Sequence, residues 1–141
     1  MTEASTESAG KVVLVVDDDD DIRTAVQEVL EEEGYSTAGA SNGREALDLL
    51  LATNDLPALV LLDLMMPEMD GWELLAKMAE DPALYRIPVA LMSAHPSIRQ
   101  ALDKQRGRHA AASMLLPKPL NLLRLLAIVE HVVPEAARMI H

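Results

Sequence analysis

The sequence predicts one α/β domain in which a five-stranded parallel sheet carries helices on both faces. Three observations support this: apolar strand-like runs alternate with helical stretches five times, the runs show little polar alternation, and no hairpin turn joins two of them. Continuous apolar runs are typical of strands covered on both faces, and strand–helix alternation indicates right-handed parallel crossovers. The expected architecture is therefore a doubly wound sheet.

Length and composition limit the classes of function. The 141 residues are half hydrophobic and carry a net charge of -11, with no cysteine. This charge argues against nucleic-acid and anionic-membrane partners, and the missing cysteines exclude disulfides and thiolate chemistry. No apolar run reaches the length of a membrane helix and no signal peptide is evident, so we expect a cytoplasmic protein. Residues 1–10 are predicted to be a disordered leader, 11–133 the domain and 134–141 a tail.

The first predicted unit is a buried strand over residues 12–16, which leads into five consecutive aspartates. A helix follows, with apolar residues at i, i+3, i+4, i+7 and i+8. Acids suit the positive end of the helix dipole, so residues 19–21 are interpreted as helix-start residues, and Gly34 is expected to end the helix.

The middle of the chain repeats this order. Residues 35–40 predict a short strand, 41–43 a turn and 44–52 a helix with apolar residues at helical spacing. Residues 59–63 predict a third strand, in which four aliphatic residues lead to Asp63. Asp70 is then a suitable N-cap for a further helix.

The last third contains two more predicted strands, over residues 88–92 and 110–116. A polar, weakly amphipathic helix over 96–106 separates them. Asn121 is predicted to cap a Leu-rich final helix that reaches residue 133. Because this helix is more apolar than one buried stripe requires, it is either deeply buried or carries a partner face; we favour the partner face, with a homodimer as one form.

Polar residues follow four of the five predicted strands. They are Asp17 and Asp18, Asp63, Ser93 and Lys118. The carboxyl ends of parallel strands lie at one edge of a sheet, so these groups should meet in one crevice. Clustered carboxylates suit Mg²⁺, while a lysine and a hydroxyl suit phosphoryl oxygens. Asp63 could then act as a nucleophile that forms an aspartyl phosphate.

These motifs give the chain a resemblance to response-regulator receiver domains, over roughly residues 11–133. The motifs are Val15-Val16-Asp17-Asp18, Leu62-Asp63-Leu64-Met65-Met66-Pro67-Glu68-Met69-Asp70-Gly71, Met92-Ser93-Ala94 and Lys118-Pro119. Their order and intervals make the combination specific. The resemblance implies the flavodoxin-like receiver fold, here expected as a stand-alone domain in two-component signalling.

The resemblance also implies a role for the acidic residues. Asp63 would accept a phosphoryl group from a histidine kinase or phosphotransfer protein. Mg²⁺ would be held by Asp18, Asp63 and the backbone carbonyl of Met65, with Asp17 ligating directly or through water. The signal would pass to a downstream protein whose identity the sequence does not give.

Three further residues receive roles from the resemblance. Ser93 would bind a phosphoryl oxygen, Lys118 would pair with Asp63 or its phosphate, and the Lys118-Pro119 peptide would be cis. The domain would not be an enzyme beyond promoting its own phosphorylation and slow hydrolysis. His95, two residues after Ser93, is expected either to be solvated or to influence that hydrolysis.

Three features depart from the family pattern. Leu115 stands where the family usually has the aromatic residue of its rotamer switch. The segment between Ser93 and Lys118 is longer than expected, with 105–109 as its predicted bulge. Pro117 removes a backbone donor, so the strand beside it should be irregular.

Two other functions compete with phosphate acceptance. A degenerate receiver would act only as a phosphorylation-independent protein-binding module, and the missing aromatic residue keeps this alternative open. A phosphatase of the haloacid dehalogenase type would need a second aspartate at position 65, where this chain has Met65.

Overall fold

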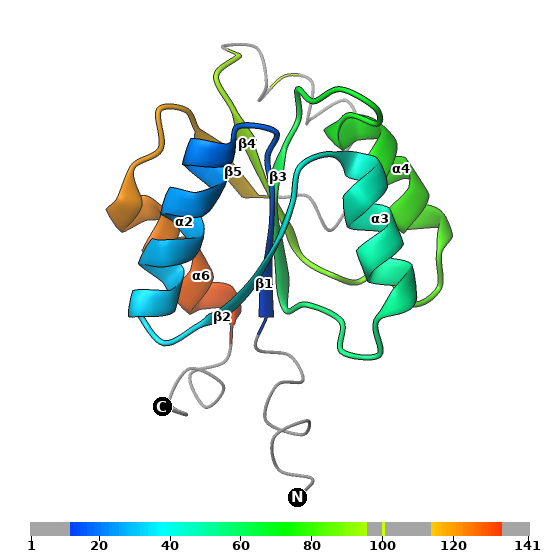
Figure 1. Cartoon of the computed structure of the whole chain (residues 1–141), viewed down its shortest axis with the longest axis horizontal. Coiled ribbons are helices and arrows are strands. Elements are labelled where there is room, and N and C mark those ends of the chain that lie inside the picture. Colours follow the sequence, from blue (N-terminus) through cyan, green and yellow to red (C-terminus); the bar gives the residue numbers. More distant parts are fainter. Residues whose placement is uncertain (1–11, 96–99, 101–113, 134–141) are drawn as a thin grey trace, which may run out of the picture.

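The computed structural model describes residues 12–95, 100 and 114–133. It confirms a parallel five-stranded sheet in the order β2-β1-β3-β4-β5 (Figure 1). The strands are β1 (Val12–Val16), β2 (Ser36–Ala40), β3 (Leu59–Asp63), β4 (Val89–Ser93) and β5 (Met114–Pro117). Within the described residues the helices are α2 (Asp20–Glu32), α3 (Gly43–Ala52), α4 (Gly71–Glu80) and α6 (Leu122–Val132). The predicted leader, the tail, the helix over 96–106, the bulge over 105–109 and the strand residues 110–113 lie outside this description.

The apolar strands are buried because their side chains alternate between two cores. In β1, Val13 and Val15 join the core beneath α2 and α6, whereas Leu14 and Val16 join the core beneath α3 and α4. Figure 1 shows these two helix pairs on opposite sides of the sheet. This arrangement explains why the strands lack polar alternation, and it confirms the prediction of a sheet covered on both faces.

The helix ends follow local side-chain chemistry. Asp19 is the N-cap of α2 and accepts hydrogen bonds from the N–H groups of Asp21 and Ile22, as its interpretation as a helix-start residue requires. After α2, Gly34 has a φ of 97°, a conformation that suits glycine at a helix end. Asp70 forms a capping box with Glu73 at the start of α4, which confirms the predicted N-cap.

Two local predictions are wrong. Gly43 is the first residue of α3 and not part of a turn, because Asn42 accepts a hydrogen bond from the N–H of Glu45 and caps the helix one residue earlier than expected. The strand at Pro117 is regular, since Pro117 pairs in register with Ser93. β5 is an edge strand, and the N–H of Lys118 donates to the Ser93 carbonyl at 2.9 Å. By alternation, the N–H that Pro117 lacks would point to the free edge, so no ladder bond is lost.

Gly71 lies against the end of β3. A Cβ added there would stand 2.7 Å from the carbonyl oxygen of Asp63 and 2.8 Å from the Cα of Leu64. The N–H of Gly71 also donates to the Leu64 carbonyl at 3.0 Å. The absence of a side chain therefore lets α4 begin beside the last residue of β3.

We expect Gly71→Ala to destabilise the protein by about 1–3 kcal/mol, the range typical of an overpacked site. Helix propensity alone predicts the opposite sign, since alanine is favoured over glycine in helices by about 1 kcal/mol. Urea unfolding of the variant decides between the two effects. Ala79→Gly, on the exposed face of α4, is the matched control and should show only the propensity cost. A Gly71→Ala variant more stable than wild type would contradict the claim that a Cβ at this position clashes with the end of β3.

The final helix exposes part of its apolar surface. Leu125 and Val129 are buried on the sheet, whereas Leu122 and Leu123 are 48% and 80% exposed. Apolar residues outside the buried stripe are therefore exposed at the first turn of this helix. The homodimer predicted through this helix stays a prediction.

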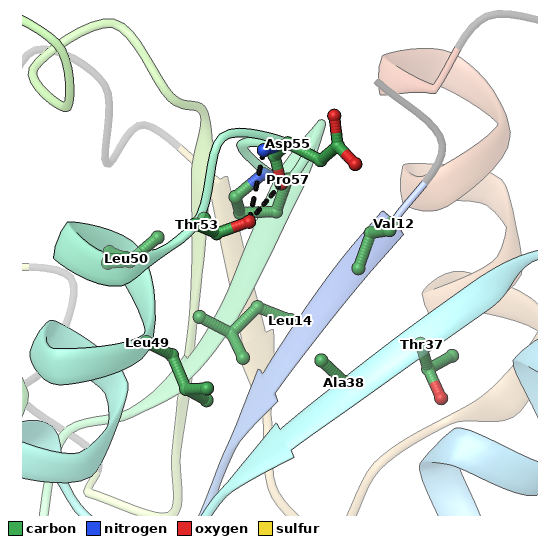
Figure 2. A pocket seen from close by; sticks show the side chains of 9 residues that line it. All are labelled: Val12, Leu14, Thr37, Ala38, Leu49, Leu50, Thr53, Asp55 and Pro57. Carbon is green, nitrogen blue, oxygen red and sulfur yellow. Dashed lines mark hydrogen bonds between the residues drawn. The ribbon is translucent and has the colours of Figure 1, made fainter. Parts of the chain in front are cut away.

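An apolar pocket of about 290 Å³ lies beside the carboxyl-terminal half of α3. Figure 2 shows its lining, in which Leu49 and Leu50 of α3 face Leu14 and Ala38 of the sheet. The short side chain of Ala38 leaves this space on β2, the edge strand. The pocket also includes Val12, at the beginning of β1, so it extends to the end of the sheet away from Asp63.

None of the described helices has both the length and the apolar character required to cross a membrane.

Candidate functional site

The strand ends bring together the residues that the sequence singled out. Asp17 and Asp18 follow β1, Asp63 and Ser93 end β3 and β4, and Lys118 follows β5. Oxygen atoms of Asp17, Asp18 and Asp63 lie within 4.8 Å of one another. Ser93, Lys118 and Asp63 line one crevice. The predicted convergence at one edge of the sheet is therefore present.

Lys118 joins the two buried carboxylates. Its Nζ donates to Asp17 Oδ2 at 2.9 Å, across 101 residues of chain, and lies 3.4 Å from Asp63 Oδ2. The resemblance implied a pairing with Asp63, and the structure adds a shorter contact with Asp17. The Lys118-Pro119 peptide is cis, as predicted.

Asp17 is fully buried, and both of its carboxylate oxygens have partners. Oδ1 accepts a hydrogen bond from the N–H of Asp19 at 2.9 Å, and Oδ2 accepts the one from Lys118. Its backbone is anchored as well, because the N–H of Asp17 donates to the Ala40 carbonyl at 3.1 Å. Burying a carboxylate is costly unless such partners satisfy its oxygens.

Asp63 has an unusual proton affinity for an aspartate. Burial, and then repulsion by Asp17, raise the pKa of Asp63 from 3.8 to about 6. The charge of Lys118 and a hydrogen bond from the N–H of Met65 to Oδ1, at 3.2 Å, act in the opposite direction. The raised pKa means that the Asp63 carboxylate binds a proton more tightly than an ordinary aspartate does, and the same environment favours binding of another positive charge.

Lys118 keeps its positive charge although its side chain is partly buried. Burial alone would lower the pKa of Lys118, but the hydrogen bond to Asp17 and the attraction to both carboxylates outweigh it, so the pKa is raised. The ammonium group is therefore fully protonated at neutral pH. It supplies one positive charge to a site that contains three acidic side chains.

The crevice beside Asp63 has a volume of about 420 Å³. Besides the polar residues, Met65, Ala94 and His95 line it. The N–H of His95 donates to Ser93 Oγ at 3.0 Å, which ties the backbone just after β4 to the end of that strand. His95 therefore lies at the crevice, as its position after Ser93 suggested.

The three carboxylates fit a divalent cation. Their donor atoms are all oxygen, they are close enough to share one ion, and the exposed Asp18 leaves the site open to water. Mg²⁺ prefers such oxygen ligands and keeps several water molecules. The N–H of Met65 bonds to Asp63, so the backbone at Met65 lies beside the carboxylate, but a role for its carbonyl stays a prediction.

Leu115, at the usual aromatic position, lies in the core beneath α3 and α4 and is 7% exposed. A buried leucine in this place cannot act as an aromatic rotamer switch.

Sequence reasoning missed the contact of Arg23 with this site. Its Nη1 donates to the backbone carbonyl of Asp17 at 2.8 Å. The spacing of Arg23 three residues after Asp20 indicates an ion pair on the same side of α2, but it gives no signal for the contact with the Asp17 carbonyl.

Comparisons with known proteins agree with this geometry. The family model described as the response regulator receiver domain matches residues 13–130. An uncharacterized protein of Leptolyngbya boryana is 36% identical over 118 residues, which are 84% of this chain and 86% of that protein. The response regulator MprA of Mycolicibacterium vanbaalenii is 39% identical over 82% of this chain, which spans only 47% of MprA. The solved structure of the Vibrio cholerae chemotaxis protein CheY4 superposes with a TM-score of 0.75 at 30% identity, covering 88% of this chain and 99% of CheY4.

Proposed function

The chain belongs to the response-regulator receiver family, and on this basis we propose that Asp63 accepts a phosphoryl group from a histidine kinase or phosphotransfer protein. The observation that carries the proposal is the meeting of Lys118 with Asp17 and Asp63 beside the exposed Asp18. A domain that served only as a scaffold would not need a half-buried ammonium between two buried carboxylates. The receiver unit is proposed to extend over residues 11–133.

The carboxylates of Asp17, Asp18 and Asp63 would hold Mg²⁺, together with the carbonyl of Met65. When bound, the ion supplies positive charge that offsets the charge on the transferred phosphoryl oxygens. Asp63 would provide the nucleophilic oxygen. The new P–O bond forms on its carboxylate as the P–N bond of a phosphohistidine breaks, and the bonding electron pair returns to the imidazole nitrogen.

Lys118 and Ser93 would receive the other phosphoryl oxygens. The ammonium of Lys118 already lies 3.4 Å from Asp63 and can pair with negative charge added there. The hydroxyl of Ser93, at the end of the neighbouring strand β4, can donate a hydrogen bond to the same group. Beyond slow hydrolysis of its own acyl phosphate, the domain is expected to have no enzymatic turnover.

The signal would leave the domain through contacts with a downstream protein. Because Leu115 replaces the usual aromatic residue, movement of Ser93 cannot be relayed by an aromatic side chain at that position. The alternative function, phosphorylation-independent binding of a protein, is distinguished by the failure of Asp63 to take up phosphate. A cytoplasmic location stays a prediction.

Incubation with acetyl phosphate tests the proposal. With Mg²⁺, intact-protein mass spectrometry should show addition of one phosphoryl group, and EDTA should suppress it. Equal uptake with EDTA would contradict the role of the acidic cluster. No uptake under either condition, in protein shown to be folded, would favour the degenerate receiver.

A further inference from the structure

The side chain of Arg23 reaches back from α2 to the loop that follows β1. Nη1 donates to the Asp17 carbonyl at 2.8 Å, and Nη2 forms an ion pair with Asp20. The side chain of Arg23 is only 18% exposed, whereas that of Asp20 is 80% exposed. The contact with Asp17 is therefore the sheltered one, and the pair with Asp20 lies at the surface.

The carbonyl of Asp17 belongs to the peptide unit that connects Asp17 to Asp18. Other contacts fix Asp17 on its amide side and through its side chain, to Ala40 and Asp19. The side chain of Asp18 is exposed, so its direction depends on the backbone that carries it. A donor on the Asp17 carbonyl fixes the rotation of this peptide unit and with it the direction of Asp18.

A second observation comes from β2, where Gly39 pairs in register with Val15. A Cβ added at Gly39 would stand 3.3 Å from Cδ of Arg23 and 2.7 Å from Oε1 of Gln27. The stem of Arg23 thus passes over a position without a side chain. The packing of β2 leaves room for the arginine in the conformation that reaches Asp17.

We propose that Arg23 is a positioning residue for the carboxylate cluster, because it orients the Asp17–Asp18 peptide for binding a divalent cation. This inference rests on the proposed function of the cluster. Electrostatics alone gives the opposite expectation, since a positive guanidinium repels a cation. Asp20 largely offsets that repulsion, so loss of the backbone contact should dominate.

The test compares Mg²⁺ affinity in variants matched for charge. The double variant Asp20→Asn/Arg23→Gln keeps the net charge of the protein but removes the donor geometry of the guanidinium. Isothermal titration should show a dissociation constant for Mg²⁺ about 10-fold higher than wild type, the lower end of what loss of a supporting hydrogen bond at a metal site costs. Asp20→Asn alone should change it about twofold or less, because an exposed pair contributes little.

Arg23→Lys tests whether the geometry of the guanidinium matters in addition to its charge. A lysine retains the charge and the stem but offers one ammonium for two acceptors, so its Mg²⁺ affinity should lie between those of wild type and the double variant. Urea unfolding without Mg²⁺ establishes that the variants are folded.

Three outcomes would overturn the inference. Wild-type affinity in the folded double variant would show that the contact does not position the cluster. A loss of Mg²⁺ affinity in Asp20→Asn alone that equals the loss in the double variant would assign the effect to charge. Wild-type protein that binds no Mg²⁺ would overturn the proposed function together with this inference, and so is distinguishable from the first two.

Discussion

The Asp63→Asn variant is expected to take up no phosphate from acetyl phosphate and, without Mg²⁺, to be more stable than wild type at pH 7. Asparagine lacks the nucleophilic carboxylate, so the loss of acceptance should be complete at the sensitivity of mass spectrometry. The stability gain follows from removing a buried charge that Asp17 repels. A variant that is inactive because it is unfolded would show the opposite change in stability.

The stability difference should depend on pH in a defined direction. The pKa of Asp63 rises from 3.8 to about 6 on folding, so between these values the folded protein binds more protons there than the unfolded chain. The contribution of Asp63 is thus most favourable below pH 3.8 and is lost as the pH rises through 6. Asparagine does not titrate, so the advantage of the variant should be small near pH 4 and reach about 1–3 kcal/mol at pH 7.

Urea unfolding of both proteins at pH 4, 5, 6 and 7 measures this difference. Asp48→Asn is the matched control, because it makes the same substitution at an aspartate that is exposed on α3. An advantage for Asp63→Asn that shrinks as the pH rises would contradict the direction of the pKa shift.

The Lys118→Met variant should lose about 3 kcal/mol of stability without Mg²⁺ at neutral pH, since removing the half-buried ammonium leaves two buried carboxylates uncompensated. Asp17 is fully buried and would lose its hydrogen bond at 2.9 Å, while Asp63 would lose the ammonium that lies 3.4 Å from its Oδ2. Added Mg²⁺ should stabilise this variant more than wild type, because the cation then supplies positive charge to carboxylates that have lost their ammonium. Phosphate uptake should also be slower, because an ammonium is missing from the phosphoryl site.

Thermal and urea unfolding with and without Mg²⁺ test this expectation. Lys77→Met is the control, since Lys77 lies on the exposed face of α4 and its loss should change stability by about 0.5 kcal/mol or less. A cost for Lys118→Met no greater than that of Lys77→Met would mean that the ion pairs of Lys118 do not hold the two strand ends together.

The fold could be predicted from the sequence because its strands are apolar along their whole length. Runs such as residues 59–62, repeated between helical stretches, favour a sheet covered on both faces, and the two cores confirm it. Asp70 could be predicted as a cap because its chemistry is local and its partner Glu73 follows three residues later. Topology then placed Asp63 and Lys118 at the same edge.

The details that could not be predicted depend on three-dimensional neighbours. Whether Lys118 lies nearer to Asp17 or to Asp63 is set by the packing of the strand ends, which sequence spacing does not encode. Pro117 was expected to disturb its strand, but the effect depends on the direction in which its missing N–H would point. The contact of Arg23 with Asp17 is a side-chain-to-backbone bond, and no residue pattern requires it.

Peptide mapping after reaction with acetyl phosphate and Mg²⁺ tests the central claim most directly. The account predicts that the phosphoryl group is found on the peptide that contains Asp63, as an acyl phosphate that hydroxylamine cleaves, and that none is found in the Asp63→Asn protein. Phosphate on a different residue, or uptake that persists in Asp63→Asn, would contradict it.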